Sequence, residues 1–416
     1  MKTRPLQARG CPLWRLGAVA ALVCCPAVAP ASPAGASDDS PAAALADLGR
    51  ALLRQAGAAN AVVSPLATAV ALGLVQAGAS GAAEHEIEAL FGARPSGPRA
   101  LRQTLPALLR QLRGNTAGAS GAPSPLSLAA RLWVDAGAAP AVPAAYTQRL
   151  ASRWQADAAR VSFAQSEAAR ALINGWTAER TAGRIQDLLP AGSVGAATQL
   201  ALTSAVHFRS PWAKPFDSTQ TTARPFKTAG GQSKSVATMV DERAVLQARV
   251  DGQLVMEIPF ARGGFALLVA VPDEGGSAAP VFGGAQLARW RGALQPAQCE
   301  LALPRFAIAP QSASIKPALQ ALGVRTVFTD VADLGPMLGR AARQMHLDDV
   351  HHAAGITVDE HGGEAVAAAA ATLRSKSLAL PVAPCAVDRA FAFALVHQAS
   401  GTAVFVGRVG DPAHLE

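Results

Sequence analysis

Side chains able to carry out enzyme chemistry are present in this 416-residue chain, but not at the spacings that enzymes need. Ser80 and Ser120 each have a glycine two positions before but an alanine two positions after, so neither forms the Gly-x-Ser-x-Gly turn of a serine hydrolase. The chain contains no His-Glu-x-x-His zinc motif, no Gly-x-x-x-x-Gly-Lys phosphate loop and no Cys-x-x-Cys pair. We therefore do not expect an enzyme.

The densest group of ionisable side chains lies at 346–352, with His346, Asp348, Asp349, His351 and His352. These residue types can ligate metal ions, but neither a helix nor a strand would place all of them on one face. The alternative interpretation is the polar start of a strand with one structural histidine. We favour that alternative and expect neither a metal nor a cofactor.

The most unusual segment lies between Thr357 and Phe391. Two glycines precede seven consecutive small apolar residues at 365–371, and a basic stretch with Arg374 and Lys376 follows. An alanine-rich helix is one interpretation, because alanine has the highest helix propensity. So short a helix is only marginally stable without an amphipathic face, and uniformly small side chains also suit a strand that slides between existing strands. The segment alone leaves both interpretations open.

The elements around this segment change in character along the chain. The first half is mainly helical and the part after 199 consists mainly of short strands separated by Gly, Pro and Asp turns. This order predicts an α+β fold in a single domain, with helices packed on large, mostly antiparallel sheets. The helices are expected at 42–53, 66–77, 101–112, 146–158 and 166–178; the strands are expected at 60–65, 126–134, 200–208, 236–240, 244–250, 253–259, 265–271, 299–308 and 392–409.

The amino terminus is typical of an export signal. Basic residues up to Arg15 precede an apolar run at 16–25, which is shorter than the ~20 residues needed to cross a bilayer. Small residues follow, and we expect a signal peptide at 1–36 and one domain at 37–416. The protein would then be secreted or periplasmic, while Cys24 and Cys25 leave a lipid-anchored form open.

The net charge excludes one class of partner. The formal charge of +8 includes four cations of the expected signal, and without them 33 basic residues face 29 acidic ones. A charge of +4 spread over 380 residues does not predict a nucleic-acid-binding protein. Arg102, Arg110 and Arg113 could bind a polyanion such as a sulfated sugar, although a solvated helix face explains them more simply.

Two cysteines, Cys299 and Cys385, remain after the expected signal, 86 positions apart. An oxidising compartment would allow one disulfide between them, but this spacing shows no disulfide framework. We expect two buried free thiols, with the disulfide as the alternative.

The sequence resembles the serpin family of serine-protease inhibitors over 42–412, and specifically an inhibitory-type, prokaryotic-looking exported serpin. Each matching motif is weak alone, but their order along the chain is specific. The motifs are 60–65 (Asn-Ala-Val-Val-Ser-Pro), 173–177 (Ile-Asn-Gly-Trp-Thr), 181–185 (Thr-Ala-Gly-Arg-Ile), 208–212 (Phe-Arg-Ser-Pro-Trp), 303–306 (Leu-Pro-Arg-Phe), 332–334 (Ala-Asp-Leu) and 405–409 (Phe-Val-Gly-Arg-Val).

This resemblance implies a serpin fold with an exposed reactive-centre loop at about 360–384. Counting sixteen residues on from Glu360, as inhibitory serpins do, puts the scissile bond between Lys376 and Ser377, with Arg374–Ser375 as the runner-up. The family's hinge pattern is matched except that glycine replaces the usual threonine at 363. The hinge residues are Glu360, Gly362, Gly363, Glu364, Ala365, Val366, Ala367 and Ala368.

The resemblance also implies a sheet-opening region containing Ser64, Ser204, Trp212 and His352. Serpins usually have asparagine at the position of Ser204 and a small hydroxyl residue at the position of Ala67. We therefore expect the polar network under the opening sheet to be thinner or rebuilt here.

The implied function is irreversible suicide-substrate inhibition of trypsin-like serine proteases, which prefer Lys or Arg. Cleavage would free the loop to insert into the main sheet as a strand, and alternation would place Gly363, Ala365, Ala367, Ala369 and Ala371 on one face. We expect a monomer. A non-inhibitory serpin that acts as a binding or transport module is the alternative, although such members commonly carry bulky or charged hinge residues.

Overall fold

The computed structural model describes residues 40–91, 101–114, 124–139, 141–275, 281–339, 345–363 and 383–412. These residues all belong to one compact unit. Among them, no helix combines the length and the apolar character that crossing a bilayer requires.

Helix starts in the first half are encoded locally. The hydroxyl of Ser40 accepts a hydrogen bond from the Ala43 amide, the hydroxyl of Ser64 accepts one from the Ala67 amide, and proline follows each serine at the first helical position. The helices of the described ranges are α1 (Pro41–Gln55), α2 (Pro65–Gln76), α3 (Gly81–Leu90), α4 (Leu101–Gly114), α5 (Ala144–Arg149), α6 (Ser166–Arg180), α7 (Gly284–Ala293), α8 (Lys316–Ala321) and α9 (Gly335–Leu338).

The larger sheet has the strand order β1-β16-β15-β9-β8-β7-β10-β14, and β6 also pairs with β7. We call it the nine-stranded sheet. Its neighbouring strands are antiparallel except for β10 and β14, which run parallel. The strands are β1 (Ala61–Val63), β6 (Thr222–Lys227), β7 (Ser233–Val250), β8 (Gln253–Pro259), β9 (Phe265–Pro272), β10 (Gln295–Pro304), β14 (Ala383–Ala386), β15 (Phe391–His397) and β16 (Thr402–Val409).

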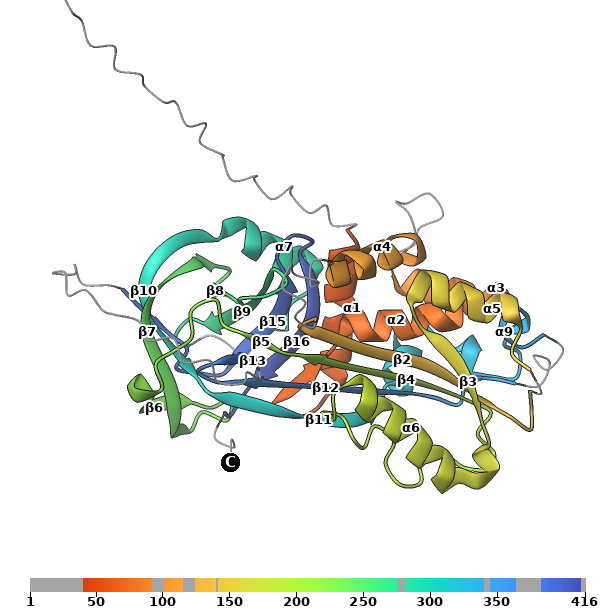
Figure 1. Cartoon of the computed structure of the whole chain (residues 1–416). Coiled ribbons are helices and arrows are strands. Elements are labelled where there is room, and N and C mark those ends of the chain that lie inside the picture. The colour runs from red at the N-terminus through yellow and green to blue at the C-terminus, as the bar shows by residue number, and fades with distance from the viewer. Residues whose placement is uncertain are drawn as a thin grey trace, which may run out of the picture. The chain divides into compact units, whose positions relative to one another are not determined.

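The seven-stranded sheet has the order β3-β2-β4-β12-β13-β5, and β11 also pairs with β12. Helix α2, whose residues are all buried, contacts β2 and β4 of this sheet and also β16, whereas α6 packs on the other face (Figure 1). The strands are β2 (Leu126–Asp135), β3 (Asp157–Val161), β4 (Leu200–Phe208), β5 (Ser210–Pro211), β11 (Phe306–Ser314), β12 (Asp349–Val358) and β13 (Gly362–Gly363).

The expected α+β class is confirmed, but two expected elements are wrong in detail. The two strands predicted on either side of residue 241 are one continuous strand, β7, because the carboxylate of Asp241 and the guanidinium of Arg243 are buried as a pair 2.9 Å apart. Their charges therefore do not break the strand. The helix predicted to reach residue 158 stops at Trp154, because Gln155 has a left-handed backbone (φ 51°) and β3 begins two residues later.

The strand predicted at 299–308 is also divided at Arg305. Its first part ends β10 and its second part begins β11, and these belong to different sheets. The strand predicted at 392–409 is a hairpin of β15 and β16 that turns near Gly401. Both corrections have the same cause, because a continuous apolar pattern does not show where a chain passes from one strand to the next.

Candidate functional site at the seam between β4 and β12

The two central strands of the seven-stranded sheet separate at one end, and the expected hinge lies between them. Strands β4 and β12 run parallel and are paired from Ala201 with Asp349 to Val206 with Ala354. Further along, β13 lies antiparallel between β12 and β5, with Gly363 paired to both Val358 and Ser210. We call the β4–β12 boundary the seam.

The register is the same along the whole seam. Where β12 pairs directly with β4, Asp349 is opposite Ala201, a difference of 148 in residue number. Where β13 lies between β12 and β5, Val358 and Ser210 both pair with Gly363, and their numbers also differ by 148. Strand β13 therefore occupies the position of an additional strand in an otherwise regular ladder. A strand extended from Gly363 along this line would be antiparallel to both neighbours.

A tight turn leads the chain from β12 into β13. The Oδ1 atom of Asp359 accepts the backbone N–H groups of His361 (2.8 Å) and Gly362 (3.1 Å). Gly362 has φ 146°, and a Cβ atom there would lie 2.3 Å from the carbonyl oxygen of Ser210. Only glycine fits this position, because a side chain would meet both the backbone of β5 and an unfavourable dihedral.

Trp212 holds this turn from the side of β5. Its indole N–H donates to the carbonyl oxygen of Asp359 (2.8 Å) and its backbone N–H donates to that of His361 (2.8 Å). The Trp212 ring is buried and stacks on Phe260 at 4.3 Å with an interplanar angle of 7°. The structure thus brings Trp212 against the hinge.

Glu360, the first hinge residue, is buried and its carboxylate is held by two partners. Thr221 donates its hydroxyl to one oxygen (2.6 Å), and the Nε atom of Arg305 lies 3.6 Å from the other. The Phe216 amide also donates to the Glu360 carbonyl (2.8 Å). Arg305 belongs to the Leu-Pro-Arg-Phe motif, which was recognised only as a family marker, and no sequence signal pointed to Thr221 or Asp359.

A side chain at position 363 would face the main hydrophobic core. A Cβ atom there would lie 3.2 Å from the Phe208 ring and 3.5 Å from the Phe260 ring. Both rings are buried and pack edge to face with centroids 4.9 Å apart. The replacement of the family's usual threonine by Gly363 has a physical reason here, because the two rings fill the space that a threonine side chain would take.

Under the seam, His352 joins three elements. Its Nε2 atom accepts the backbone N–H of Ser64 (3.1 Å), so the proton of the neutral ring is on Nδ1, which donates to the hydroxyl of Ser204 (2.7 Å). The Ser64 hydroxyl in turn donates to the carbonyl oxygen of Val404 in β16 (2.7 Å). The polar network is therefore rebuilt with Ser204, whereas Ala67 contributes only its backbone N–H to the Ser64 hydroxyl.

Burial keeps His352 neutral at neutral pH. Loss of hydration lowers the pKa of His352 to about 4, although a hydrogen bond with the backbone of Ser204 opposes this shift. Protonation would place a hydrogen on Nε2, directly against the amide hydrogen of Ser64. Acid should therefore break the Ser64 bond and weaken the seam.

The remaining polar residues of 346–352 form separate contacts. His346 pairs with Asp330 (2.9 Å), and the carboxylate of Asp348 accepts the amides of Gln199 and Leu200. Burial lowers the pKa of His351. Within the described parts of the chain, no group of three or more His, Cys, Asp or Glu residues is arranged to hold a metal ion.

Several predicted residues lie outside the described ranges and their placement stays a prediction. These are the signal at 1–36, the later hinge residues Glu364, Ala365, Val366, Ala367 and Ala368, and the candidate cleavage residues Arg374, Ser375, Lys376 and Ser377. Of the three arginines considered for a polyanion, Arg110 is exposed on α4.

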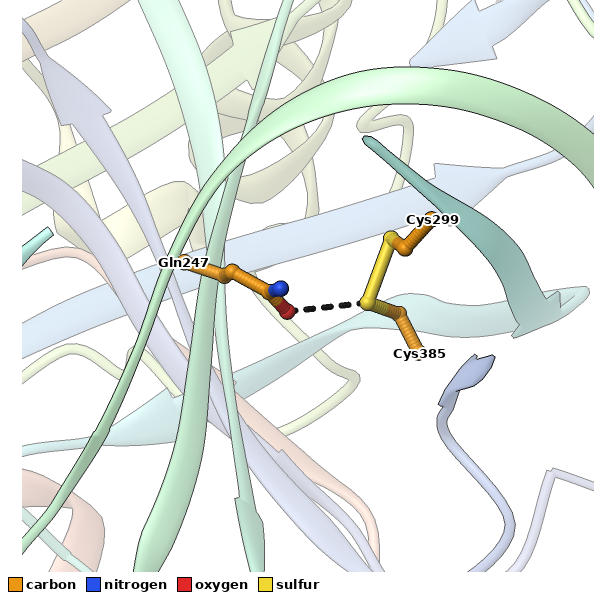
Figure 2. The surroundings of a disulfide bond; sticks show 3 residues. All are labelled: Gln247, Cys299 and Cys385. Atoms are coloured by element: carbon orange, nitrogen blue, oxygen red, sulfur yellow. Dashed lines mark hydrogen bonds between the residues drawn. A yellow bond between two sulfur atoms is a disulfide. The ribbon is translucent and has the colours of Figure 1, made fainter. Parts of the chain in front are cut away.

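The expectation of free thiols is wrong, because Cys299 and Cys385 form a disulfide with Cα atoms 5.8 Å apart (Figure 2). The reason is the pairing of β10 with β14, in which Cys299 is opposite Ala383 and Leu301 is opposite Cys385. The two cysteines are thus two positions apart on adjacent strands and point to the same face. The 86-residue separation in sequence gave no sign of this.

Comparisons with known proteins identify the family. The family model "Serpin (serine protease inhibitor)" matches residues 42–412, and the chain belongs to the serpin family. Wheat Serpin-Z1C is 30% identical over 377 residues, covering 86% of this chain and 91% of the relative. Human Serpin B9 is 30% identical over 269 residues, covering 62% and 70%. The expected prokaryotic character is not borne out by these plant and human relatives.

Solved structures support the fold. Mouse protein-Z dependent protease inhibitor has a TM-score of 0.75 at 22% identity and covers 90% of this chain and 97% of that one. Uncleaved ovalbumin has a TM-score of 0.75 at 23% identity and covers 90% and 100%. Members of the serpin family are generally protease inhibitors and not enzymes, in agreement with the absence of enzyme motifs from the sequence.

Proposed function

We propose that this serpin is an irreversible suicide-substrate inhibitor of trypsin-like serine proteases. The observation that carries the proposal is β13, which lies antiparallel between β12 and β5 in the register of an inserted strand. The residues that follow it from 365 to 371 are alanines and one valine. Small side chains of this kind can enter a packed layer without displacing much of it.

In the first step, the protease supplies the chemistry. Its serine oxygen attacks the carbonyl carbon of Lys376, the bond to the nitrogen of Ser377 breaks, and the serine proton passes through the protease's histidine to the departing amine. An ester then joins Lys376 to the protease. A specificity pocket with an acidic residue would pair with the lysine ammonium, which explains the preference for Lys or Arg.

In the second step, the freed segment fills the seam. Extending the register from Gly363 places Ala369 between Ser204 and His352, and Thr372 between Ala201 and Asp349. Nine residues at ~3.3 Å each cover roughly 30 Å, which carries the attached protease along the sheet. The residues at 365, 367, 369 and 371 would share the core-facing side of Gly363, and all four are alanine.

The opposite face of the inserted strand would meet the side of the sheet covered by α6. Ala205 and Ala353 on that side pack with Ile185 and Leu188, and Trp176 of α6 lies against them. The inserted residues facing them are Val366, Ala368, Ala370 and Thr372. Because the sheet contributes alanines at this level, an added strand can lie under α6 with small changes in packing.

The energetics favour insertion and require a barrier. Inserting a strand replaces one hydrogen-bonded ladder with two, and each of about ten added bonds contributes ~1 kcal/mol net. The uncleaved state must therefore be kinetically trapped. Separating β4 from β12 by one strand roughly doubles their ~4.8 Å spacing and breaks the bond between His352 and Ser204. This bond is part of the barrier.

Mixing the protein with trypsin tests the proposal. We expect a covalent complex that survives SDS and heat, together with a released carboxyl-terminal fragment whose first residue is Ser377. A fragment beginning at Ser375 would move the bond to Arg374. Cleavage without any complex would refute inhibition and favour a binding or transport module, and turnover of a peptide substrate by the protein itself would indicate an enzyme.

We also propose that the protein acts outside the cytoplasm, as a monomer, after removal of residues 1–36. Sequencing of the mature amino terminus should begin at Ser37, and labelling with fatty acid would instead reveal a lipid anchor at Cys24 or Cys25. The mechanism needs no polyanion. A polyanion would be a partner if a sulfated polysaccharide accelerated the reaction with trypsin and the Arg110→Ala variant lost that acceleration.

A further inference from the structure

The two ends of the proposed loop belong to different sheets. Gly363 is in the seven-stranded sheet, and Ala383, 20 residues later, begins β14 at the edge of the nine-stranded sheet. In Figure 1, β10, which carries β14, lies at the β13 end of the seven-stranded sheet and not at its far end. The described residues on either side of the loop, Gly363 and Ala383, therefore lie toward the same end of the seven-stranded sheet.

This arrangement limits insertion of an uncleaved loop. If residues up to 372 filled the seam, the chain would have to turn at its far end and return to β14. Ten residues, 373–382, are available for this return, and fully extended they span at most about 36 Å. That length must cover the turn, the roughly 30 Å of inserted strand and the step to the nine-stranded sheet, so it leaves almost no slack. Detaching β14 would add its four residues, so release of β14 would ease insertion of the uncleaved loop.

Without a crosslink, β14 would be easy to release. Among the described strands it is an edge strand of four residues paired only with β10, and Val387 adds one backbone hydrogen bond to Ala302 (2.9 Å). Such edges are the first parts of a sheet to open. The disulfide between Cys299 and Cys385 joins this strand to β10, and both cysteines are buried.

We propose that the Cys299–Cys385 disulfide is a clamp that makes insertion of the loop depend on cleavage. This inference rests on the proposed function. Cleavage after Lys376 separates the inserting segment from β14, so the clamp does not oppose the productive reaction. It opposes only the competing one, in which the intact loop inserts and the inhibitor is lost without meeting a protease.

The surroundings of the bridge accommodate its reduced form as well. The Gln247 side-chain oxygen lies 2.9 Å from the Cys385 sulfur (Figure 2), where it would accept a hydrogen bond from a thiol. A small dithiol would supply two electrons and two protons, becoming a cyclic disulfide while the bridge becomes two thiols. Reduction should therefore release the clamp while the fold persists.

The test compares the wild type with the double variant Cys299→Ala/Cys385→Ala, which leaves no single thiol. Each uncleaved protein is incubated at 37 °C without protease, and samples are assayed for monomers that trypsin no longer cleaves in the loop and that resist thermal unfolding. We expect the double variant to convert at least about tenfold faster, since the disulfide no longer ties β14 to β10. Dithiothreitol should produce the same change in the wild type, with release of two thiols measured by a colorimetric thiol reagent.

Val269→Ala in β9 is the matched control, because it removes buried volume from the same sheet away from β14. Equal conversion rates for wild type and double variant, or equally fast conversion of Val269→Ala, would overturn the clamp. Nicking both proteins in the loop separates this result from the proposed function. A gain in thermal stability after nicking in both proteins supports insertion whatever the clamp does, whereas no gain in either would overturn the insertion mechanism itself.

Discussion

The seam of the seven-stranded sheet and the centre of the nine-stranded sheet are both buried, but they are held together differently. Of the six pairs along the seam, Leu202 with Val350 and Val206 with Ala354 are apolar core pairs. The other four join small or polar side chains, such as Ser204 with His352 and Ala205 with Ala353. In the other sheet, Phe393 of β15 pairs with Val269 and Gly407, and Phe391 and Phe405 are fully buried nearby. Small and polar side chains lose little apolar contact when two strands part, whereas aromatic side chains lose a great deal.

The buried histidines of the two regions show the same difference. His352 in the seam bonds to Ser204 on the neighbouring strand and to Ser64 on a third element. His397 in β15 bonds to Ser400 in the turn of its own hairpin (2.8 Å). A hydrogen bond across strands ends abruptly when they separate. The seam therefore depends on directional bonds, in addition to its apolar pairs, more than the aromatic-rich centre of the nine-stranded sheet does.

The largest effect is expected from a charge in the seam. Gly363→Glu would place a carboxylate against the buried Phe208 and Phe260 rings, which costs several kcal/mol and would displace β13 from the position at which insertion begins. The ratio of covalent complex to cleaved inhibitor, measured on a gel after reaction with trypsin, should fall at least about tenfold. His361→Glu is the control, because that side chain is 43% exposed and should tolerate a charge. An unchanged ratio for Gly363→Glu would contradict insertion along the seam.

A cavity in the nine-stranded sheet should reduce stability and leave inhibition unchanged. Phe393→Ala removes a fully buried ring that packs on Phe306, and the free energy of unfolding should fall by about 3–5 kcal/mol. Urea denaturation measures this loss. The folded fraction should still give the wild-type ratio of complex to cleavage, and a changed ratio would mean that this sheet also participates in insertion.

Acid should weaken the seam through His352. Because its pKa in the folded protein is about 4 and in an unfolded chain about 6.5, the unfolded chain binds more protons between these values. The stability that neutral His352 contributes is complete above pH 6.5 and decreases by about 3 kcal/mol as the pH falls through 4. The urea concentration at the unfolding midpoint should fall between pH 7 and pH 4 in the wild type, and it should depend less on pH in His352→Gln.

His397→Gln provides the comparison for that experiment. Burial and the nearby Arg291 also lower the pKa of His397, so this variant should remove part of the pH dependence of global unfolding. It should not change the rate at which the intact loop inserts in acid, which His352→Gln should alter. The same insertion rate for both variants would remove the distinction between the two regions.

The smallest effect is expected from removing a single hydroxyl. Ser204→Ala leaves the Nδ1–H of His352 buried without its partner, and the free energy of unfolding should fall by about 1–2 kcal/mol. The matched variant is Ser400→Ala, which removes the corresponding partner of His397. Both variants should lower the free energy of unfolding, but only Ser204→Ala should speed insertion of the uncleaved loop. The amount of trypsin-resistant monomer, measured over time, reports that rate.

Much of this molecule was determined by its sequence. Local patterns located α1, α2, α6, β4 and β8, since apolar periodicity and turn residues act over a few positions. The ordered motifs indicated the family, and the run of small residues indicated a segment suited to insertion. The hinge match, which includes Gly362 and Gly363, pointed to the place where the structure shows β13.

Only the tertiary structure decided which distant residues meet. The bridge between Cys299 and Cys385 depends on β14 pairing with β10, and the role of Ser204 depends on β12 lying beside β4. Likewise, the charged residues Asp241 and Arg243 favour a break between two strands in the sequence, whereas in the structure they form a buried pair within the continuous strand β7. The physical reason is the same in each case. Burial, pairing and loss of hydration depend on neighbours that the folded chain brings together from far apart in the sequence.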